Sequence, residues 1–291
     1  MNRRVTISLF VLYCLALLLL HGMSWLTLRF SYLIPLLLPL ALLEKDAKRF
    51  LTQWTPFYLI ILAYDGLRGF ADDLATRIDF MTLPTMERWL CGGILPTLWL
   101  QEWLDNPLEG WLGGLLLVSY FGHFFIPVAT CYVLWRRDHE AFRLTITSIT
   151  AISLLGFATF LVFPAAPPWL AAQVDAIPPV KRLIVYHLQS LTAGAGLPRL
   201  YVEMNPNPIA PFPSLHAGYP LVLWLCIKEY APRWQWPFAF NVFLAAFSIV
   251  AFGEHYFVDV LGGWVYAILA FYPVRKWVKE KRSRQIRPRR L

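Results

Sequence analysis

The sequence predicts an all-α, polytopic integral membrane protein, and three observations support this class. The chain has 291 residues, of which 58% are hydrophobic and only 15% are charged. Its mean hydropathy is +0.51, and a soluble domain could not cover so much apolar surface. Finally, the apolar residues form runs of about 20, the length at which a helix crosses a bilayer.

About eight spans are expected, an N-terminal pair followed by six helices. The second run is short and contains Pro35 and Pro39. In chain order, the candidate spans are 6–28, 30–43, 51–68, 111–135, 142–163, 214–230, 237–253 and 255–274. The simplest organisation is an N-terminal transmembrane pair (1–50), a catalytic six-helix membrane core (51–274) and a basic tail (275–291).

Two long connections separate these spans. Residues 69–110 contain the stretch from Met86 to Leu104, MERWLCGGILPTLWLQEWL, in which tryptophans and scattered acids predict an amphipathic helix in the membrane interface. Residues 164–213 are rich in proline and small residues, and a connection of this length is usually functional or disordered.

The basic residues predict the orientation. The formal net charge is +8, but the tail alone carries nine Lys/Arg and one Glu, so we expect no nucleic-acid partner. The connections on the same side as the tail, 44–50, 136–143 and 228–236, each hold two or three Lys/Arg. Connection 69–110 instead has two arginines and seven acids. The positive-inside rule therefore makes the tail cytoplasmic and able to touch anionic lipid.

This topology brings several polar residues to the non-cytoplasmic face. The helices starting at Ser214 and His255 begin there, and the helix ending near Arg68 finishes there. In a helix, His255 and Asp259 are four residues apart and share a face. The carboxylate would fix the tautomer of the ring and leave its other nitrogen free. A structural His–Asp pair between helices is the alternative.

The stretch PFPSLHAGYP (211–220) predicts a phosphate site. Ser214 suits a helix N-cap, and the free N–H groups of the first turn, at Leu215 and His216, favour anions. The alternative is a capped helix with an interfacial histidine. Arg68 is the best-placed cation for phosphoryl oxygens, unless it pairs with Asp65.

Two histidines, an aspartate and such a helix end suggest phosphoryl transfer in two steps. His255 would attack phosphorus and form a phosphohistidine, while His216 would give a proton to the departing oxygen. His123 is a further candidate for substrate binding because it lies within a span, although counting places it below the level of the site. It could equally form a helix-packing hydrogen bond. Lys181, Arg182 and Arg199 are weaker candidates, read as solvated loop charges.

Several motifs carry a family resemblance. PSLHAG (213–218) and HYFVD (255–259) resemble the second and third signature motifs of the type-2 phosphatidic acid phosphatase superfamily. FPAAPPW (163–169), GEHYFVDVLGG (253–263), YDGLRG (64–69) and GHFFIP (122–127) resemble its inositol phosphorylceramide synthase branch and bacterial relatives.

The resemblance implies a six-helix core without metal or cofactor, with His255 as nucleophile, Asp259 as its orienter and His216 as general acid. It implies that a phosphoinositol-like head group moves from a phospholipid donor to a lipid acceptor in sphingolipid metabolism. A lipid-phosphate phosphatase with water as acceptor is the main alternative. The chain departs from the superfamily at Ser248 and Ile249, where the third motif usually has Ser-Arg, and in lacking the first motif Lys-x6-Arg-Pro. These departures favour the transferase branch.

Two other classes stay open. A transporter or scaffold could use the His–Asp pair structurally or as a proton relay, and two histidines with an aspartate could hold zinc. The four scattered cysteines are too few for a disulfide framework or a metal cluster. The membrane could be a plasma, inner or lumenal one, and nothing in the sequence indicates an oligomeric state.

Overall fold

The structure, a computed structural model, describes residues 7–8, 11–12, 14–16, 18–19, 23, 47–74, 77–104, 111–192, 198, 201–202 and 209–286. The chain forms two compact units, residues 1–70 with 188–207 and residues 71–187 with 208–291. Most of the predicted spans 6–28 and 30–43 lies outside the described residues. The described residues confirm the all-α class, since they form helices and only one isolated β-bridge, between Asp79 and Ala165. Helix α3 (Ala47–Leu74) begins in the first unit and covers the predicted span 51–68.

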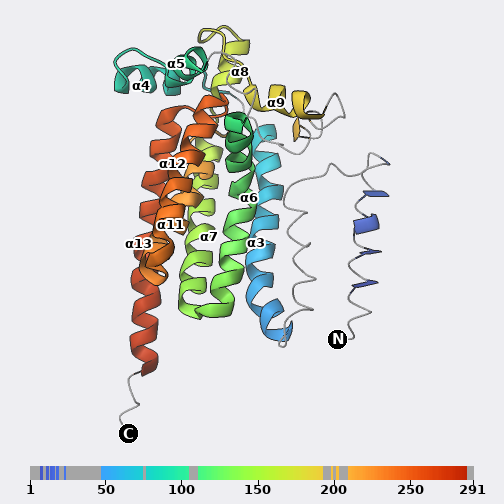
Figure 1. Ribbon diagram of the computed structural model, residues 1–291, viewed down its shortest axis with the longest axis vertical. Coiled ribbons are helices and arrows are strands. Elements are labelled where there is room, and N and C mark those ends of the chain that lie inside the picture. The colour runs from blue at the N-terminus through green and yellow to red at the C-terminus, as the bar shows by residue number, and fades with distance from the viewer. Residues whose placement is uncertain are drawn as a thin grey trace. The chain divides into compact units, whose positions relative to one another are not determined.

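The second unit is built around five helices that begin within a few residues of the predicted spans and, except for the last, end within a few residues of them. These are α6 (Trp111–Arg137), α7 (His139–Val162), α11 (Leu215–Tyr230), α12 (Gln235–Ala251) and α13 (Phe257–Ile286). Helix α13 continues to Ile286, twelve residues beyond the predicted end at 274 and into the predicted basic tail. Helix α11 packs against the other four, so it forms the centre of this bundle (Figure 1). A short 3-10 helix, η2 (Pro232–Trp234), joins α11 to α12.

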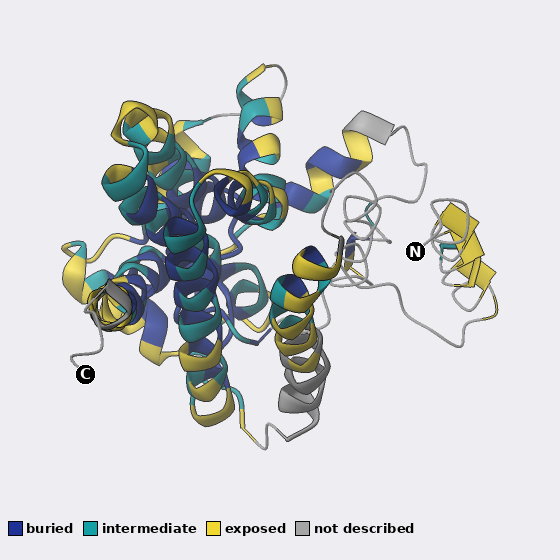
Figure 2. Cartoon of the chain, turned by 90° about the horizontal axis from the view of Figure 1, so that it is seen from below, coloured by how far each residue is buried: buried dark blue, intermediate teal, exposed yellow. Residues whose placement is uncertain are grey.

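The surfaces of the bundle are those of a membrane protein. Buried residues gather on the inner faces of the helices, and many outward-facing residues are large and apolar, such as Val118, Val162 and Trp236 (Figure 2). Among the described residues, four helical stretches are long and apolar enough to cross a membrane: Trp111–Arg137, His139–Val162, Pro232–Ala251 and Phe257–Ser283. The chain is therefore an integral membrane protein, while the total of eight spans stays a prediction. Helix α11 has 16 residues and is about 24 Å long, shorter than the hydrocarbon core of a bilayer.

Short helices cover the end of the bundle at which α11 and α13 begin (Figure 1). They are α4 (Thr82–Leu90), α5 (Pro96–Trp103), α8 (Pro168–Gln173) and the first part of α9 (Leu183–Thr192), a helix whose residues from Leu188 onward belong to the other unit. The prediction of one amphipathic helix over 86–104 is wrong in that α4 and α5 are separate. Gly92 and Gly93 have φ values of +65° and +92°, which interrupt a right-handed helix, and Pro96 starts the next one. The interfacial location stays a prediction, and the exposed faces carry Trp89, Trp99 and Trp103.

A small apolar cluster lies under these short helices. Leu83 and Leu95 pack there with Ala165, Ala166 and Ala171 from the proline-rich connection, and with Tyr256 and Val258 at the start of α13. The connection itself pairs with the segment before α4, because Asp79 donates to the carbonyl of Pro164 and accepts from Ala166. Residues 164–187 of this connection, which belong to the same unit as α13, thus form structure that covers the start of that helix.

Candidate active site

His255 lies in a tight turn between α12 and α13. The turn depends on Gly253, whose φ of +75° is in the left-handed region and whose Cβ, if present, would stand 2.8 Å from Val180. The N–H groups of Glu254 and His255 both donate to the carbonyl of Ile249. Helix α13 begins only at Phe257, so His255 precedes the helix in which the sequence placed it.

Asp259 nevertheless faces His255 from the first turn of α13. Its Oδ2 is 3.4 Å from His255 Nδ1 and accepts the N–H of Tyr256 at 2.8 Å. This second contact is the N3 half of a capping box, because Tyr256 is the residue before the helix. Asp259 is fully buried and His255 is 6% exposed. The pairing leaves Nε2 as the nitrogen of His255 that points away from the carboxylate.

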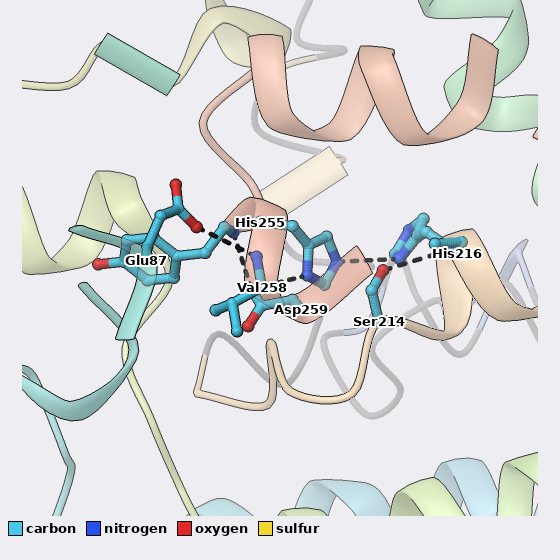
Figure 3. Close-up of polar contacts among 8 residues, drawn as sticks. Glu87, Ser214, His216, His255, Val258 and Asp259 are labelled. Carbon is cyan, nitrogen blue, oxygen red and sulfur yellow. Dashed lines mark hydrogen bonds and ion pairs between the residues drawn. The ribbon is translucent and has the colours of Figure 1, made fainter. Parts of the chain in front are cut away.

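His216 lies on the other side of His255, in the first turn of α11. Its Nδ1 is 3.3 Å from His255 Nε2, so the two rings and Asp259 form one chain of polar contacts (Figure 3). The hydroxyl of Ser214 accepts the N–H of Ala217 at 3.3 Å, which is the N-cap that the sequence predicts. The N–H of Ser214 donates to the carbonyl of Asp259 at 3.0 Å. The two helix starts are therefore bonded directly to each other.

Leu215, named with Ser214 for substrate binding, is buried at 9% exposure. Its side chain packs at Gly156 of α7, where a Cβ would come within 3.1 Å of it. Any contact of Leu215 with substrate would thus come from its backbone, and this role stays a prediction.

A third histidine adjoins the pair. His123 of α6 is buried, and its Nδ1 is 2.7 Å from the carbonyl of Tyr120, to which it donates. Its ring centroid is 3.7 Å from that of His216, and the ring of Tyr120 stacks on His216 at 5.1 Å. The expectation that His123 lies below the level of the site is wrong. His123 is twelve residues after the start of α6 at Trp111, a distance of about 18 Å along the helix. Because His216 lies beside His123, the site is about that far below the first residue of α6.

Arg182 and Glu254 form an ion pair beside the same turn. Arg182 Nε is 2.7 Å from Oε1 of Glu254, and Nη2 is 3.3 Å from Oε2. The guanidinium also lies over Trp169 at 4.1 Å, at the end of FPAAPPW. The reading of Arg182 as a solvated loop charge is therefore wrong, because it ties the proline-rich connection to the residue next to His255. Lys181 meets Gln101 through its backbone N–H and carbonyl.

A further buried acid, Glu87 of α4, contacts the start of α13 and is fully buried. Its Oε2 accepts the N–H of Val258 at 3.2 Å. Burial raises the pKa of this carboxyl to about 8, and the nearby charge of Asp259 acts in the same direction. Sequence reasoning missed Glu87, which it counted only as one of seven acids in a loop.

The structure describes less of two other predictions, the cationic residues and the zinc site. The side chain of Arg68 in α3 lies outside the described residues, as does Arg199, so the cationic role of either stays a prediction. Within the described ranges, no group of three or more His, Cys, Asp and Glu side chains is arranged to hold a metal ion. The zinc alternative therefore receives no support from that part of the chain.

The fold and the site together define a class of protein. Apolar helices set two histidines and a buried carboxylate beneath a cover of short helices, an arrangement that fits a membrane-embedded enzyme. The family described as the PAP2 superfamily matches residues 82–273, more than half of the chain, so this protein belongs to the PAP2 superfamily. It is a lipid phosphotransferase or phosphatase of that superfamily.

Two curated proteins are similar to this chain. The phosphoinositol dihydroceramide synthase of Bacteroides thetaiotaomicron is 24% identical over 93% of this chain and 91% of its own length. The inositol phosphorylceramide synthase catalytic subunit aur1 of Schizosaccharomyces pombe is 26% identical over 67% of this chain and 46% of its own length. No solved structure gives a significant match.

Proposed function

We propose that this enzyme transfers a phosphorylated polar head group from one lipid to another through a phosphohistidine on His255. The observation that carries the proposal is the continuous polar chain from Asp259 through His255 to His216, with separations of 3.4 Å and 3.3 Å. A carboxylate, a nucleophile and a proton carrier in that order are the minimum set for covalent catalysis with acid–base assistance.

In the first step, the lone pair on Nε2 of His255 forms a bond to the phosphorus of the donor phosphodiester. The bond from phosphorus to the departing lipid oxygen breaks, and protonated His216 gives that oxygen a proton. Asp259 stabilises the positive charge that develops on the ring of His255 and keeps Nδ1 protonated. The contact between the two rings must open to admit phosphorus, and the partial exposure of His216 leaves it the more accessible ring.

In the second step, an acceptor hydroxyl gives its proton to His216 and its oxygen bonds to phosphorus. The bond from phosphorus to nitrogen breaks, and the electron pair returns to Nε2 of His255. If the acceptor is a lipid alcohol, the product is a new phospholipid. If it is water, the same site works as a phosphatase.

The relatives support a choice of head group and acceptor. The name of the Bacteroides protein, which aligns along nearly the whole chain, specifies phosphoinositol and dihydroceramide. We therefore take a phosphoinositol-like head group as the transferred unit and a ceramide-like lipid as the acceptor. The N-terminal turn of α11, together with Arg68, would hold the phosphoryl oxygens. His123 would contribute from α6, next to His216.

The test uses the purified full-length protein in vesicles with phosphatidylinositol labelled in its head group. We expect a new labelled lipid, distinct from the donor, when ceramide, dihydroceramide or a diacylglycerol with acyl chains different from the donor's is added, and an acid-labile label on the protein during turnover. His255→Ala should lose both signals. Labelled inositol phosphate without a new lipid, whichever acceptor is added, would show hydrolysis instead of transfer. Unchanged turnover in both His255→Ala and His216→Ala would exclude the mechanism and leave the transporter or scaffold class.

A further inference from the structure

A buried carboxyl on α4 reaches the catalytic turn from a different part of the chain. Helix α4 turns Leu83, Pro84 and Glu87 inward and leaves Met86 and Trp89 exposed on its other face. Burying a carboxyl is unfavourable unless it gains hydrogen bonds. Glu87 finds its donor 171 residues away in the chain, at the N–H of Val258.

The start of α13 lacks a capping side chain of its own. The first N–H groups of a helix have no partner within it, and the residue before the helix usually accepts from them through Ser, Thr, Asp or Asn. Here that residue is Tyr256, whose ring cannot do so. Asp259 serves only the N–H of Tyr256. One of the next N–H groups, that of Val258, donates to Oε2 of Glu87 at 3.2 Å.

We propose that Glu87 is a positioning residue for the reaction, which caps the first turn of α13 from outside and so holds His255 between Asp259 and His216. The inference rests on the proposed role of His255 as nucleophile. Figure 3 shows the arrangement, with Glu87 on one side of the turn that carries His255 and Asp259, and His216 on the other. If this cap is lost, the first turn of α13 can fray, and both the 3.4 Å and the 3.3 Å contacts of His255 depend on that turn.

Helix α4 is itself held firmly enough to serve as this anchor. Asp79 accepts from the N–H groups of Met81 and Thr82 and from the hydroxyl of Thr82, which fixes the start of α4. The backbone of Asp79 pairs with the segment at Ala165. Glu87 therefore couples the covering layer of the site to the turn that bears His255.

The character of the carboxyl suggests a sharp test. Because burial raises the pKa of Glu87 to about 8, the side chain is mostly an uncharged acid at neutral pH. Glutamine has the same shape and keeps a carbonyl oxygen that accepts a hydrogen bond, whereas methionine has a similar size and no such oxygen. Glu87→Gln and Glu87→Met are therefore a matched pair that differs in the acceptor. Glu102→Gln, at an exposed position of α5, is the control for loss of an acid in the covering layer.

In steady-state assays of the full chain in vesicles, Glu87→Met should lower kcat by about 10- to 100-fold, the scale of a misplaced reacting group, with KM changed less than about threefold. Glu87→Gln should keep kcat within about threefold of the wild type, and Glu102→Gln should match the wild type. If Glu87→Met does not fold, Glu87→Asp provides the test, since it withdraws the carboxyl by one methylene and should also lower kcat alone.

Three results would overturn the inference: wild-type kcat in Glu87→Met or Glu87→Asp, equal losses in the Gln and Met variants, or a change confined to KM. His255→Ala, measured in parallel, separates this failure from failure of the proposed function. An inactive His255→Ala beside a fully active Glu87→Met rejects only the role of Glu87. A fully active His255→Ala rejects the nucleophile itself.

Discussion

Asp259 joins three parts of the site through two groups, its side-chain Oδ2 and its backbone carbonyl. Its side chain faces His255 and accepts the N–H of Tyr256, while its carbonyl accepts the N–H of Ser214. The aspartate therefore orients the proposed nucleophile, holds the residue that precedes its own helix and links α13 to α11. The fully buried carboxyl is stabilised through Oδ2, which makes both of these side-chain contacts.

Asp259→Asn should separate the charge of this residue from its structural contacts. The amide oxygen can still accept the N–H of Tyr256, but an amide does not stabilise positive charge on His255 and can present its NH2 group to Nδ1, which selects the wrong tautomer. We expect a loss in kcat of at least about 100-fold with a melting temperature close to that of the wild type. Burst measurements of the phosphohistidine should show slow formation. A variant with normal burst rate would contradict the orienting role.

The sequence was informative about individual residues where their chemistry is local. His216 and His255 could be matched because each stands at the start of an apolar run, and Asp259 follows His255 by one helical turn. Glu87 and His123 could not be assigned in this way. The contact of Glu87 forms only when α4 packs on the start of α13, 171 residues later in the chain. The level of His123 relative to His216 depends on how α6 and α11 are staggered.

Among the elements, the crossing of α11 and α13 is the closest approach that supports the site. A Cβ on Gly218 would lie 2.5 Å from Ile152 and 3.1 Å from the carbonyl oxygen of Gly263, and a Cβ on Gly263 would collide with the carbonyl oxygen of Ser214. Small residues let helix backbones come this near in membrane proteins. The hydrogen bond from Ser214 to Asp259 depends on that spacing.

Gly263→Ala should force the two helices apart at the level of the site. We expect it to destabilise the fold by about 1–3 kcal/mol or more, and to lower turnover in the protein that still folds. Gly114→Ala on α6 is the matched control, because no atom lies within 4 Å of the added methyl and alanine favours the helix by up to about 1 kcal/mol. Melting temperatures in detergent and kcat of the folded fraction measure both effects. Similar melting temperatures in the two variants would show that the crossing is not tight.

Element boundaries were predictable where the signals are local and unpredictable where packing decides. Spans 111–135 and 142–163 were predictable as α6 and α7 because their junction is marked in the sequence. Two arginines, Arg136 and Arg137, end α6, and Asp138 is the N-cap of α7. Gly92 and Gly93 also indicate the separation of α4 from α5. The prediction of a single helix instead relied on the tryptophans on both sides of these glycines. The helices in connection 164–213 carry too little periodicity to be read from the sequence.

For the whole molecule, composition was enough to predict the class, and the described bundle agrees with it. The outward faces are apolar along α6, α7, α12 and α13, as expected for contact with lipid. Polar contacts gather at both ends of the bundle, around His216 and His255 at one end and around Glu229 and Glu140 at the other. The number of spans and the domain boundaries stay predictions, because they depend mainly on residues 1–46. The orientation of the membrane core is likewise a prediction from charge.

The sidedness can be tested at the two ends of α12. Helix α5 packs against α12, with Gln101 hydrogen-bonded to Ala251 at the end of α12, and Arg233 lies just before the start of α12. The 17 residues of α12, about 26 Å, therefore separate residue 102 from residue 233. Because Lys/Arg-rich connections stay in the cytoplasm, residue 233 should be cytoplasmic and residue 102 should face the other side. The variants Glu102→Cys and Arg233→Cys would be made in a chain without Cys14 and Cys91, leaving Cys131 and Cys226, which are buried.

A membrane-impermeant maleimide added to sealed vesicles with the non-cytoplasmic face outward should label the cysteine at 102 at once and that at 233 only after permeabilisation. The reverse pattern would put His216 and His255 on the cytoplasmic side, because both lie at the same end of the bundle as α5. Lipid substrate would then have to come from the inner leaflet. Labelling of both positions before permeabilisation would contradict a membrane crossing by α12, which is one of the four apolar stretches long enough to span.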